Sequence, residues 1–327
     1  MIEHSFLIIV VIFFALNMGA SGIVPSFASA YGAKIIRNKN AIALFALFVI
    51  LGAVSLGKGV TVTLGKNLLP AQALNFNTAL IILAAAASGL FLANILKIPQ
   101  STSQVTVGAI VGAGLYFGQL NVKTIFFKIL PLWVILPVLS YALTWLLYRR
   151  IYPPENDNLH IYQKLFANEK KLRLWALAAG CYVAFAIGTN NVGNAVGPLF
   201  GAGILGANFG LLLISPLFGA GALILGKGPL ETAGKEIVPL GLFSSTLISF
   251  VTATLLIVAS ILGVPQSLVQ LNVFSIFAVS GLKNGHRHTL GRQVTKKTFF
   301  IWAVTPLLSL AVSYAILLLI GKAYAKL

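Results

Sequence analysis

Apolar stretches of about 20 residues, the length that a helix needs to cross a bilayer, recur along the whole chain with short polar loops between them. They lie near residues 6–31, 40–57, 75–97, 99–118, 124–148, 174–203, 208–226, 240–262, 264–282 and 298–320. Because hydrocarbon offers no partner for backbone N–H and C=O groups, we expect every stretch to be helical. The pattern predicts an all-α polytopic membrane protein with about ten crossings and no soluble domain.

The composition agrees with this pattern. Of the 327 residues, 58% are hydrophobic and 9% are charged, whereas a soluble domain carries roughly 25% charged residues. The first stretch follows Glu3 and His4 rather than the positively charged residues of a signal peptide, and it shows no small-residue cleavage site. We therefore expect it to remain in the protein as a helix.

Two of the stretches contain polar and flexible residues at membrane depth, "NMGASGIVPS" at 17–26 and "IGTNNVGNAVGP" at 187–198. Glycine tolerates unusual dihedral angles and proline lacks an N–H group, so both segments are predicted to interrupt their helices. A broken helix exposes free N–H groups and the positive end of its dipole. Both features favour an anion.

A second pair of polar segments is "PQSTSQ" at 99–104 and "PQSLVQ" at 265–270. Proline followed by serine or threonine indicates the start of a helix, where hydroxyls cap the helix or reach a ligand. Small residues also line close contacts between helices, and a Ser or Thr hydroxyl can bond to the preceding turn. A single Gly or Ser therefore indicates little, whereas two related pairs of polar segments predict a substrate site.

The chain repeats itself. "GAVSLGKGVTVTLGK" at 52–66 returns as "GALILGKGPLETAGK" at 221–235, an offset of 169 that also relates Gly19 to Gly188. Later, "KIPQSTSQ" at 97–104 returns as "GVPQSLVQ" at 263–270, an offset of 166. Three blocks in the same order predict two repeats, residues 1–148 and 174–327, joined by a linker loop at 149–173.

The basic residues indicate that the second repeat is inverted. The loops at 34–39 and 283–297 are rich in Lys and Arg, whereas their repeat partners at 203–208 and 118–124 hold one such residue between them. Placing 34–39, 149–173 and 283–297 in the cytoplasm satisfies the positive-inside rule and leaves both termini outside. Inverted repeats, here of about five segments each with broken helices and hairpins at the midplane, are the architecture of secondary transporters.

Carboxylates are scarce. The six are Glu3, Glu155, Asp157, Glu169, Glu231 and Glu236. Only Glu231 and Glu236 can lie near membrane-embedded structure, and an ionisable residue there is a functional candidate. Glu231 either carries a coupling proton or pairs with Lys227 or Lys235 at a helix end, and the sequence leaves both readings open.

The formal net charge of +17 does not predict nucleic acid as a partner, because most basic residues lie in short loops, where they set topology. A basic vestibule that attracts anions is the alternative reading. Cys181 is alone, and the four histidines show no metal-ligand spacing, so no disulfide, metal or cofactor is predicted. No Ser/His/Asp set or phosphate-binding loop occurs, and the chain is not predicted to be an enzyme.

Four blocks of the chain resemble a known family. "IGTNNVGNAVGPL" resembles the GANDVANAxGP signature of the inorganic phosphate transporter (PiT) family, and "MGASGIVPSFASAYGAK" resembles its first copy. "IPQSTSQVTVGAIVGAGL" is similar to that family's PxSTTHxxxGAxxGAGL hairpin, and "LGKGPLETAGK" to a block with a Thr-Glu-Thr core. The resemblance covers both halves outside the central loop. It implies a transporter and, by family habit, a homodimer.

The chain departs from the family at residues that the resemblance links to sodium. The signature aspartate becomes Gly22 in the first copy and Asn191 in the second, and the hairpin histidine becomes Gln104 and Gln270. Sodium is a hard cation that prefers oxygen ligands with carboxylate among them, so we expect a weak sodium site or none. Sulfate is a dianion that only accepts hydrogen bonds, and a carboxylate would repel it. The pattern resembles the sulfate permease (CysP-type) branch of the family.

We therefore predict a secondary active permease that imports sulfate across the cytoplasmic membrane by alternating access and proton symport, with Glu231 as the proton carrier. The alternatives are an inorganic phosphate transporter, coupled to sodium or protons, and an uncoupled anion channel. The predicted partners are sulfate or a related oxyanion, protons, the lipid bilayer and a second copy of the chain. The predicted substrate-binding residues are Ser101, Thr102, Ser103, Gln104, Ser267, Gln270, Ser21, Asn190, Asn191 and Asn194.

Overall fold

The computed structural model describes residues 2–95, 100–237, 241–285 and 293–324, and within these ranges the chain is helical and contains no strand. The elements of the first half are α1 (Ile2–Gly32), α2 (Asn38–Leu56), α3 (Lys58–Val62), the π-helical turn η1 (Thr63–Asn67), α4 (Phe76–Ile95), α5 (Thr102–Phe117), α6 (Val122–Thr124), the π-helical turn η2 (Ile125–Ile129) and α7 (Leu130–Arg149). They are followed by α8 (Leu159–Ala167), α9 (Glu169–Gly201), α10 (Ala207–Leu225), α11 (Lys227–Ile237), α12 (Leu242–Ile261), α13 (Leu268–Asn284) and α15 (Gln293–Tyr324).

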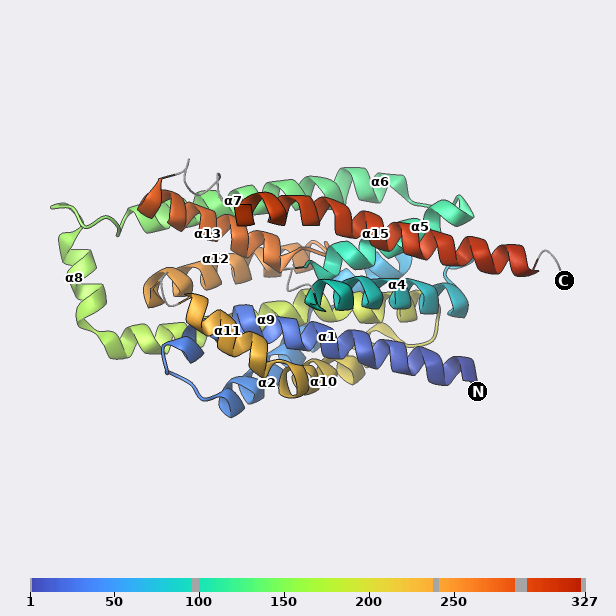
Figure 1. The fold of residues 1–327 in the computed structure, drawn as a ribbon, viewed down its shortest axis with the longest axis horizontal. Coiled ribbons are helices and arrows are strands. Elements are labelled where there is room, and N and C mark those ends of the chain that lie inside the picture. Colours follow the sequence, from blue (N-terminus) through green and yellow to red (C-terminus); the bar gives the residue numbers. More distant parts are fainter. Residues whose placement is uncertain (1, 96–99, 238–240, 286–292, 325–327) are drawn as a thin grey trace.

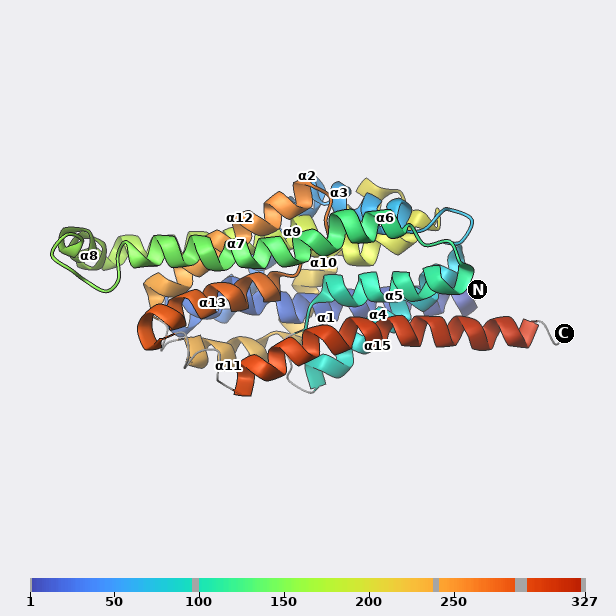
Figure 2. The ribbon, with the colours of Figure 1, turned by 90° about the horizontal axis from the view of Figure 1, so that it is seen from above.

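The predicted membrane segments are present as helices, but they are not ten crossings. Among the described residues, six helices are long and apolar enough to cross a membrane: α1, α2, the continuous run from α6 to α7, α9, α10 and α12. The helix α5 has 16 residues and α13 has 17, fewer than the roughly 20 that a crossing needs. Figures 1 and 2 show α4 with α5 in one half of the long axis and α12 with α13 in the other. Both pairs turn back near the centre, so the described helices do not make the ten crossings expected.

We call α4 and α5 the first hairpin, and α12 and α13 the second hairpin. From the centre, α5 runs toward one end of the molecule and α13 toward the opposite end (Figure 2). The long helices α1 and α9 also run in opposite directions (Figure 1). An inverted repeat predicts such relations. The exact boundaries of the two halves stay a prediction.

Two of the three loops that the sequence assigns to the cytoplasm, 34–39 and 149–173, lie at one end; the middle of the third, 283–297, lies outside the described residues. The turn between α1 and α2 and the linker that contains α8 lie at the same end of the long axis, whereas the start of α1 and the end of α15 lie at the other (Figure 1). The two ends therefore differ in charge in the sense that the positive-inside rule requires. Which end faces the cytoplasm stays a prediction.

The predicted interruptions at 17–26 and 187–198 are wrong, because α1 and α9 are continuous through both segments. The glycines serve close packing instead. A Cβ atom on Gly19 would lie 2.1 Å from the Phe218 carbonyl oxygen, and one on Gly188 would lie 2.1 Å from that of Val49. Pro25 and Pro198 lie inside the helices, and membrane helices tolerate proline where neighbouring groups satisfy the freed backbone.

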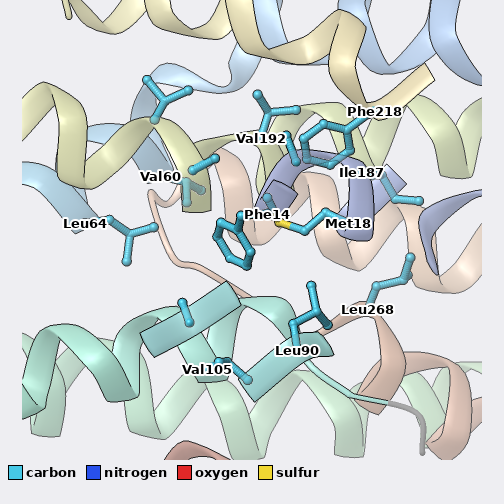
Figure 3. Packing of buried hydrophobic residues seen from close by; sticks show 14 of the residues in the cluster. Phe14, Met18, Val60, Leu64, Leu90, Val105, Ile187, Val192, Phe218 and Leu268 are labelled. Atoms are coloured by element: carbon cyan, nitrogen blue, oxygen red, sulfur yellow. The ribbon is translucent and has the colours of Figure 1, made fainter. Parts of the chain in front are cut away.

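A shared apolar core holds the helices around the hairpin tips. Figure 3 shows it at close range, with side chains from both halves of the chain in one cluster: Phe14, Met18, Val60, Leu64, Leu90, Val105, Ile187, Val192, Phe218 and Leu268. The core places the middle of α9 beside the starts of α5 and α13. Polar side chains are concentrated there.

Candidate functional site

The two hairpin tips carry the same capping geometry. Ser101 precedes α5 with φ −89° and ψ 111°, and Ser267 precedes α13 with φ −85° and ψ 107°. Their hydroxyl oxygens accept hydrogen bonds from the backbone N–H groups of Gln104 at 3.2 Å and Gln270 at 3.1 Å. The predicted helix starts are thus confirmed. Each cap leaves other N–H groups of the first turn free to bind an anion.

Hydrogen bonds bring the two tips and α9 together. The Asn194 Nδ2 group donates to the hydroxyl oxygens of Thr102 and Ser103, both at 3.2 Å. The Ser103 hydroxyl in turn donates to the carbonyl oxygen of Gln266 at 3.1 Å. Hydrogen bonds therefore join residues from the first hairpin, the second hairpin and the middle of α9 into one group.

Asn190 lies one turn before Asn194 and bonds only to the second hairpin. Its Nδ2 group donates to the Ser260 hydroxyl at 2.9 Å and to the Val264 carbonyl oxygen at 3.0 Å. Its Oδ1 atom accepts from the Gln266 N–H at 3.0 Å. These bonds hold the turn that leads into α13.

We call the group made of residues 100–104, Asn190, Asn194, Gln266, Ser267 and Gln270 the central polar cluster. Several of its buried side-chain atoms have no hydrogen-bond partner among the described residues: Nε2 and Oε1 of Gln100 and of Gln266, Oε1 of Gln104 and of Gln270, and Oδ1 of Asn194. An unpaired polar atom in a protein interior costs about 1–3 kcal/mol. Buried polar atoms normally have partners, so such a concentration marks this group as the candidate place for a polar ligand.

Gln100 and Gln266 are absent from the residues that the sequence predicts for the site. Both are buried, with 7% and 0% of their surface exposed. Each directly follows the proline of a "PQS" segment, and the two are related by the repeat offset of 166. That repetition of an amide next to the predicted helix starts was the signal that could have found them.

The structure does not bring every predicted residue into the central polar cluster. Ser21 is half-buried, and its hydroxyl donates to the Met18 carbonyl oxygen within α1 at 3.1 Å. Asn191 is half-buried, and its Oδ1 atom is enclosed without a partner among the described residues. The other eight predicted residues belong to the cluster.

Glu231 has a partner outside the cluster. Its Oε1 atom accepts a hydrogen bond from the Tyr31 hydroxyl at 3.4 Å, near the end of α1. Among the described side chains it forms no ion pair with Lys227. The side chains of Lys235 and Glu236 lie outside the described residues.

The chemistry of the central polar cluster is that of binding. Its side chains are amides and hydroxyls, joined by the N-termini of two helices, and no member carries a charge. Amides and hydroxyls donate hydrogen bonds to oxyanions, and helix N-termini add positive potential. Two opposed hairpins that meet at such a group are the arrangement expected of an anion permease.

Comparison with known proteins agrees with that class. The chain matches the model of the Phosphate transporter family over residues 18–164 and 154–313, and it belongs to that family. It is 38% identical to the sulfate permease CysP of Bacillus subtilis over 313 residues, which cover 95% of this chain and 86% of that protein. It is 27% identical to a putative phosphate permease of Methanocaldococcus jannaschii, over 91% of this chain and 92% of the relative.

A solved structure shares the fold. A chain described as the sodium-dependent phosphate transporter superposes with a TM-score of 0.82, covering 98% of this chain and 100% of that one, at 23% identity. Relatives of both kinds, sulfate and phosphate permeases, therefore resemble this protein. The choice between the two substrates depends on the chemistry of the site.

Proposed function

We propose that this protein is a secondary active transporter that imports sulfate across the cytoplasmic membrane. The observation that carries the proposal is the central polar cluster, in which two helix N-termini and a set of unpaired amides meet without a carboxylate. Sulfate carries two negative charges and only accepts hydrogen bonds. The similarity to the sulfate permease of Bacillus subtilis supports the same substrate.

The proposed ligands fall into two groups: side chains that still have a free donor, and side chains that bond to one another. The hydroxyls of Ser101 and Ser267 accept from backbone N–H groups, so each keeps its own O–H to donate. The side chains of Gln104 and Gln270 lie one turn further along the same helices. Thr102, Ser103 and Asn194 hold one another in this conformation, and an entering oxyanion would compete for their donors.

Phosphate is the second candidate substrate. Hydrogen phosphate needs an acceptor for its own proton, and the unpaired Oε1 atoms of Gln104 and Gln270 could supply one. An amide can turn to present its NH₂ group to sulfate, which a carboxylate cannot do. The absence of a carboxylate from the described cluster is the reason that we rank sulfate first.

The test is uptake of labelled sulfate by the purified full chain in proteoliposomes. We expect sulfate to accumulate above its external concentration when the outside is more acidic than the inside, with or without sodium. Equilibration without accumulation would indicate an uncoupled anion channel, and a strict need for sodium would overturn proton coupling. Competition by phosphate but not by thiosulfate or selenate would overturn the sulfate assignment.

Glu231 is the proposed proton carrier. The equivalent position in the first repeat, at an offset of 169, is Val62, so the second repeat alone places a carboxylate there. We expect Glu231→Gln to abolish the response of uptake to a pH gradient while exchange of internal for external sulfate continues. The control is Glu155→Gln, which changes an exposed carboxylate of the linker. An unchanged pH response in Glu231→Gln would exclude this residue as the carrier.

Three further features complete the proposal. Alternating access would open the central polar cluster to each side in turn, by movement of the hairpin tips. Both termini would lie outside, because the basic loops at 34–39 and 149–173 are at the opposite end of the molecule from the start of α1 and the end of α15. The protein would act as a homodimer, as the family resemblance implies.

A further inference from the structure

The two α9 asparagines of the central polar cluster differ in how many of their hydrogen-bonding atoms have partners. Asn190 uses both Nδ2 hydrogens, toward Ser260 and Val264, and its Oδ1 atom accepts from Gln266. It is completely buried. Asn194 also uses its two hydrogens, but its Oδ1 atom has no partner among the described residues. An amide offers two donors and one acceptor oxygen, so Asn190 has no donor left for a ligand.

Asn190 bonds to a turn that needs such bonds. Gly263 has a positive φ of 66°, and Pro265 has no N–H group. Non-helical backbone at membrane depth persists only where protein groups satisfy it. In this turn the Val264 N–H donates to the Ala259 carbonyl at 2.8 Å, and the Pro265 carbonyl accepts from the Trp133 indole at 2.7 Å. The Val264 carbonyl and the Gln266 N–H are two further groups of this turn, and Asn190 binds both.

The same bonds determine where the Gln266 side chain lies. The Gln266 N–H is held by Asn190, and its carbonyl is held by the Ser103 hydroxyl. The side chain is buried, yet neither Oε1 nor Nε2 has a partner among the described residues. The backbone of this residue is therefore committed to protein, and its side-chain amide is the part available to a ligand.

We propose that Asn190 is a positioning residue that presents the Gln266 amide to the transported oxyanion and does not contact the oxyanion itself. This inference rests on the proposed function and refines its site: Gln266 becomes a ligand, and Asn190 acts through it. The first repeat lacks an asparagine that bonds in this way to the turn of its hairpin. The equivalent of Asn190 is Ser21, whose hydroxyl bonds within its own helix.

The first experiment measures the turn without reference to transport. Hydrogen exchange of the segment 264–267 is followed in the full chain, unsubstituted and with Asn190→Ala, and Asn194→Ala serves as the matched control. Loss of the bond to the Gln266 N–H should speed its exchange about tenfold in Asn190→Ala, and Asn194→Ala should leave it unchanged. Equal exchange in the unsubstituted and Asn190→Ala proteins would overturn the positioning role.

The second experiment asks whether Asn190 acts through Gln266. Sulfate uptake is measured for Asn190→Ala, Gln266→Ala and the double variant. If both residues serve one contact, each single change should raise KM about tenfold with little effect on the maximal rate, and the double change should raise KM no further. KM effects that multiply in the double variant would show Asn190 to be an independent ligand and overturn the proposal.

A replacement variant and a transport control separate a folding defect, a failure of the proposed function and a failure of the positioning role. If Asn190→Ala does not fold, Asn190→Ser replaces it, because the first repeat already holds serine at this position within a continuous helix. The serine variant should show the same faster exchange. Absence of sulfate uptake in the unsubstituted chain would overturn the proposed function, whereas unchanged exchange at Gln266 would overturn only the positioning role.

Discussion

The two hairpins are alike at their tips and different along their lengths. Both begin their second helix with a serine cap of nearly the same backbone geometry. Along α13, hydroxyl groups bond across to α7: Ser140 donates to the Leu271 carbonyl at 2.9 Å, and its oxygen lies 2.7 Å from that of Ser275. The position equivalent to Ser275 in α5, at an offset of 166, is Ala109.

The first hairpin is instead held by close van der Waals contact between α5 and α15. A Cβ atom on Gly108 would lie 2.3 Å from the Pro306 carbonyl oxygen, and one on Gly112 would lie 2.2 Å from that of Leu310. These glycines let α5 and α15 approach closely, as small residues do in membrane helices. Directional bonds hold the second hairpin against α7, whereas close van der Waals contact holds the first hairpin against α15.

The largest expected effect tests whether both hairpins face one anion. A carboxylate about 4 Å from a charge contributes about 4 kcal/mol at an effective dielectric constant near 20, which corresponds to roughly a thousandfold in affinity. We therefore expect Gln104→Glu and Gln270→Glu each to abolish measurable sulfate uptake. The control, Gln163→Glu, adds the same charge at an exposed position of α8. If only one of the two changes had this effect, the hairpins would not share a single pocket.

A smaller effect is expected where α5 meets α15. Gly112→Ala places a methyl group against the Leu310 carbonyl and must push the helices apart, and overpacking of this kind costs about 1–3 kcal/mol. Thermal unfolding of the purified protein in detergent should show a lower Tm than for the unsubstituted chain. Gly206→Ala is the control, because nothing lies within 4 Å of its added methyl group. Equal Tm values for both variants would contradict close packing of α5 against α15.

The smallest expected effect concerns the bond between α7 and the second tip. Trp133→Phe keeps the aromatic packing but removes the indole N–H that donates to the Pro265 carbonyl at 2.7 Å. One such hydrogen bond contributes about 1 kcal/mol, so exchange of the segment 263–267 should speed by less than tenfold. Trp175→Phe, at an exposed position in α9, serves as control. No change in exchange would mean that the indole bond does not help to hold this turn.

Much of the fold follows from local pattern. The apolar stretches became helices because hydrocarbon leaves the backbone no other way to pair its polar groups. Proline followed by serine marked both helix starts, since a hydroxyl beside the first free N–H groups is a local feature. The sequence failed where the outcome depended on neighbours. The glycines at 17–26 and 187–198 were predicted to break helices, yet Gly19 and Gly188 allow other helices to pack close.

By itself, then, the sequence determined a helical membrane protein whose halves repeat and whose polar residues gather in two related pairs of segments. Only the tertiary structure decided which of those residues share a site and what each one does there. Asn190 and Asn194 are the same residue type one turn apart on one helix, and they face different hydrogen-bond partners. A side chain's role depends on which of its donors and acceptors are already taken, and that depends on segments distant in sequence.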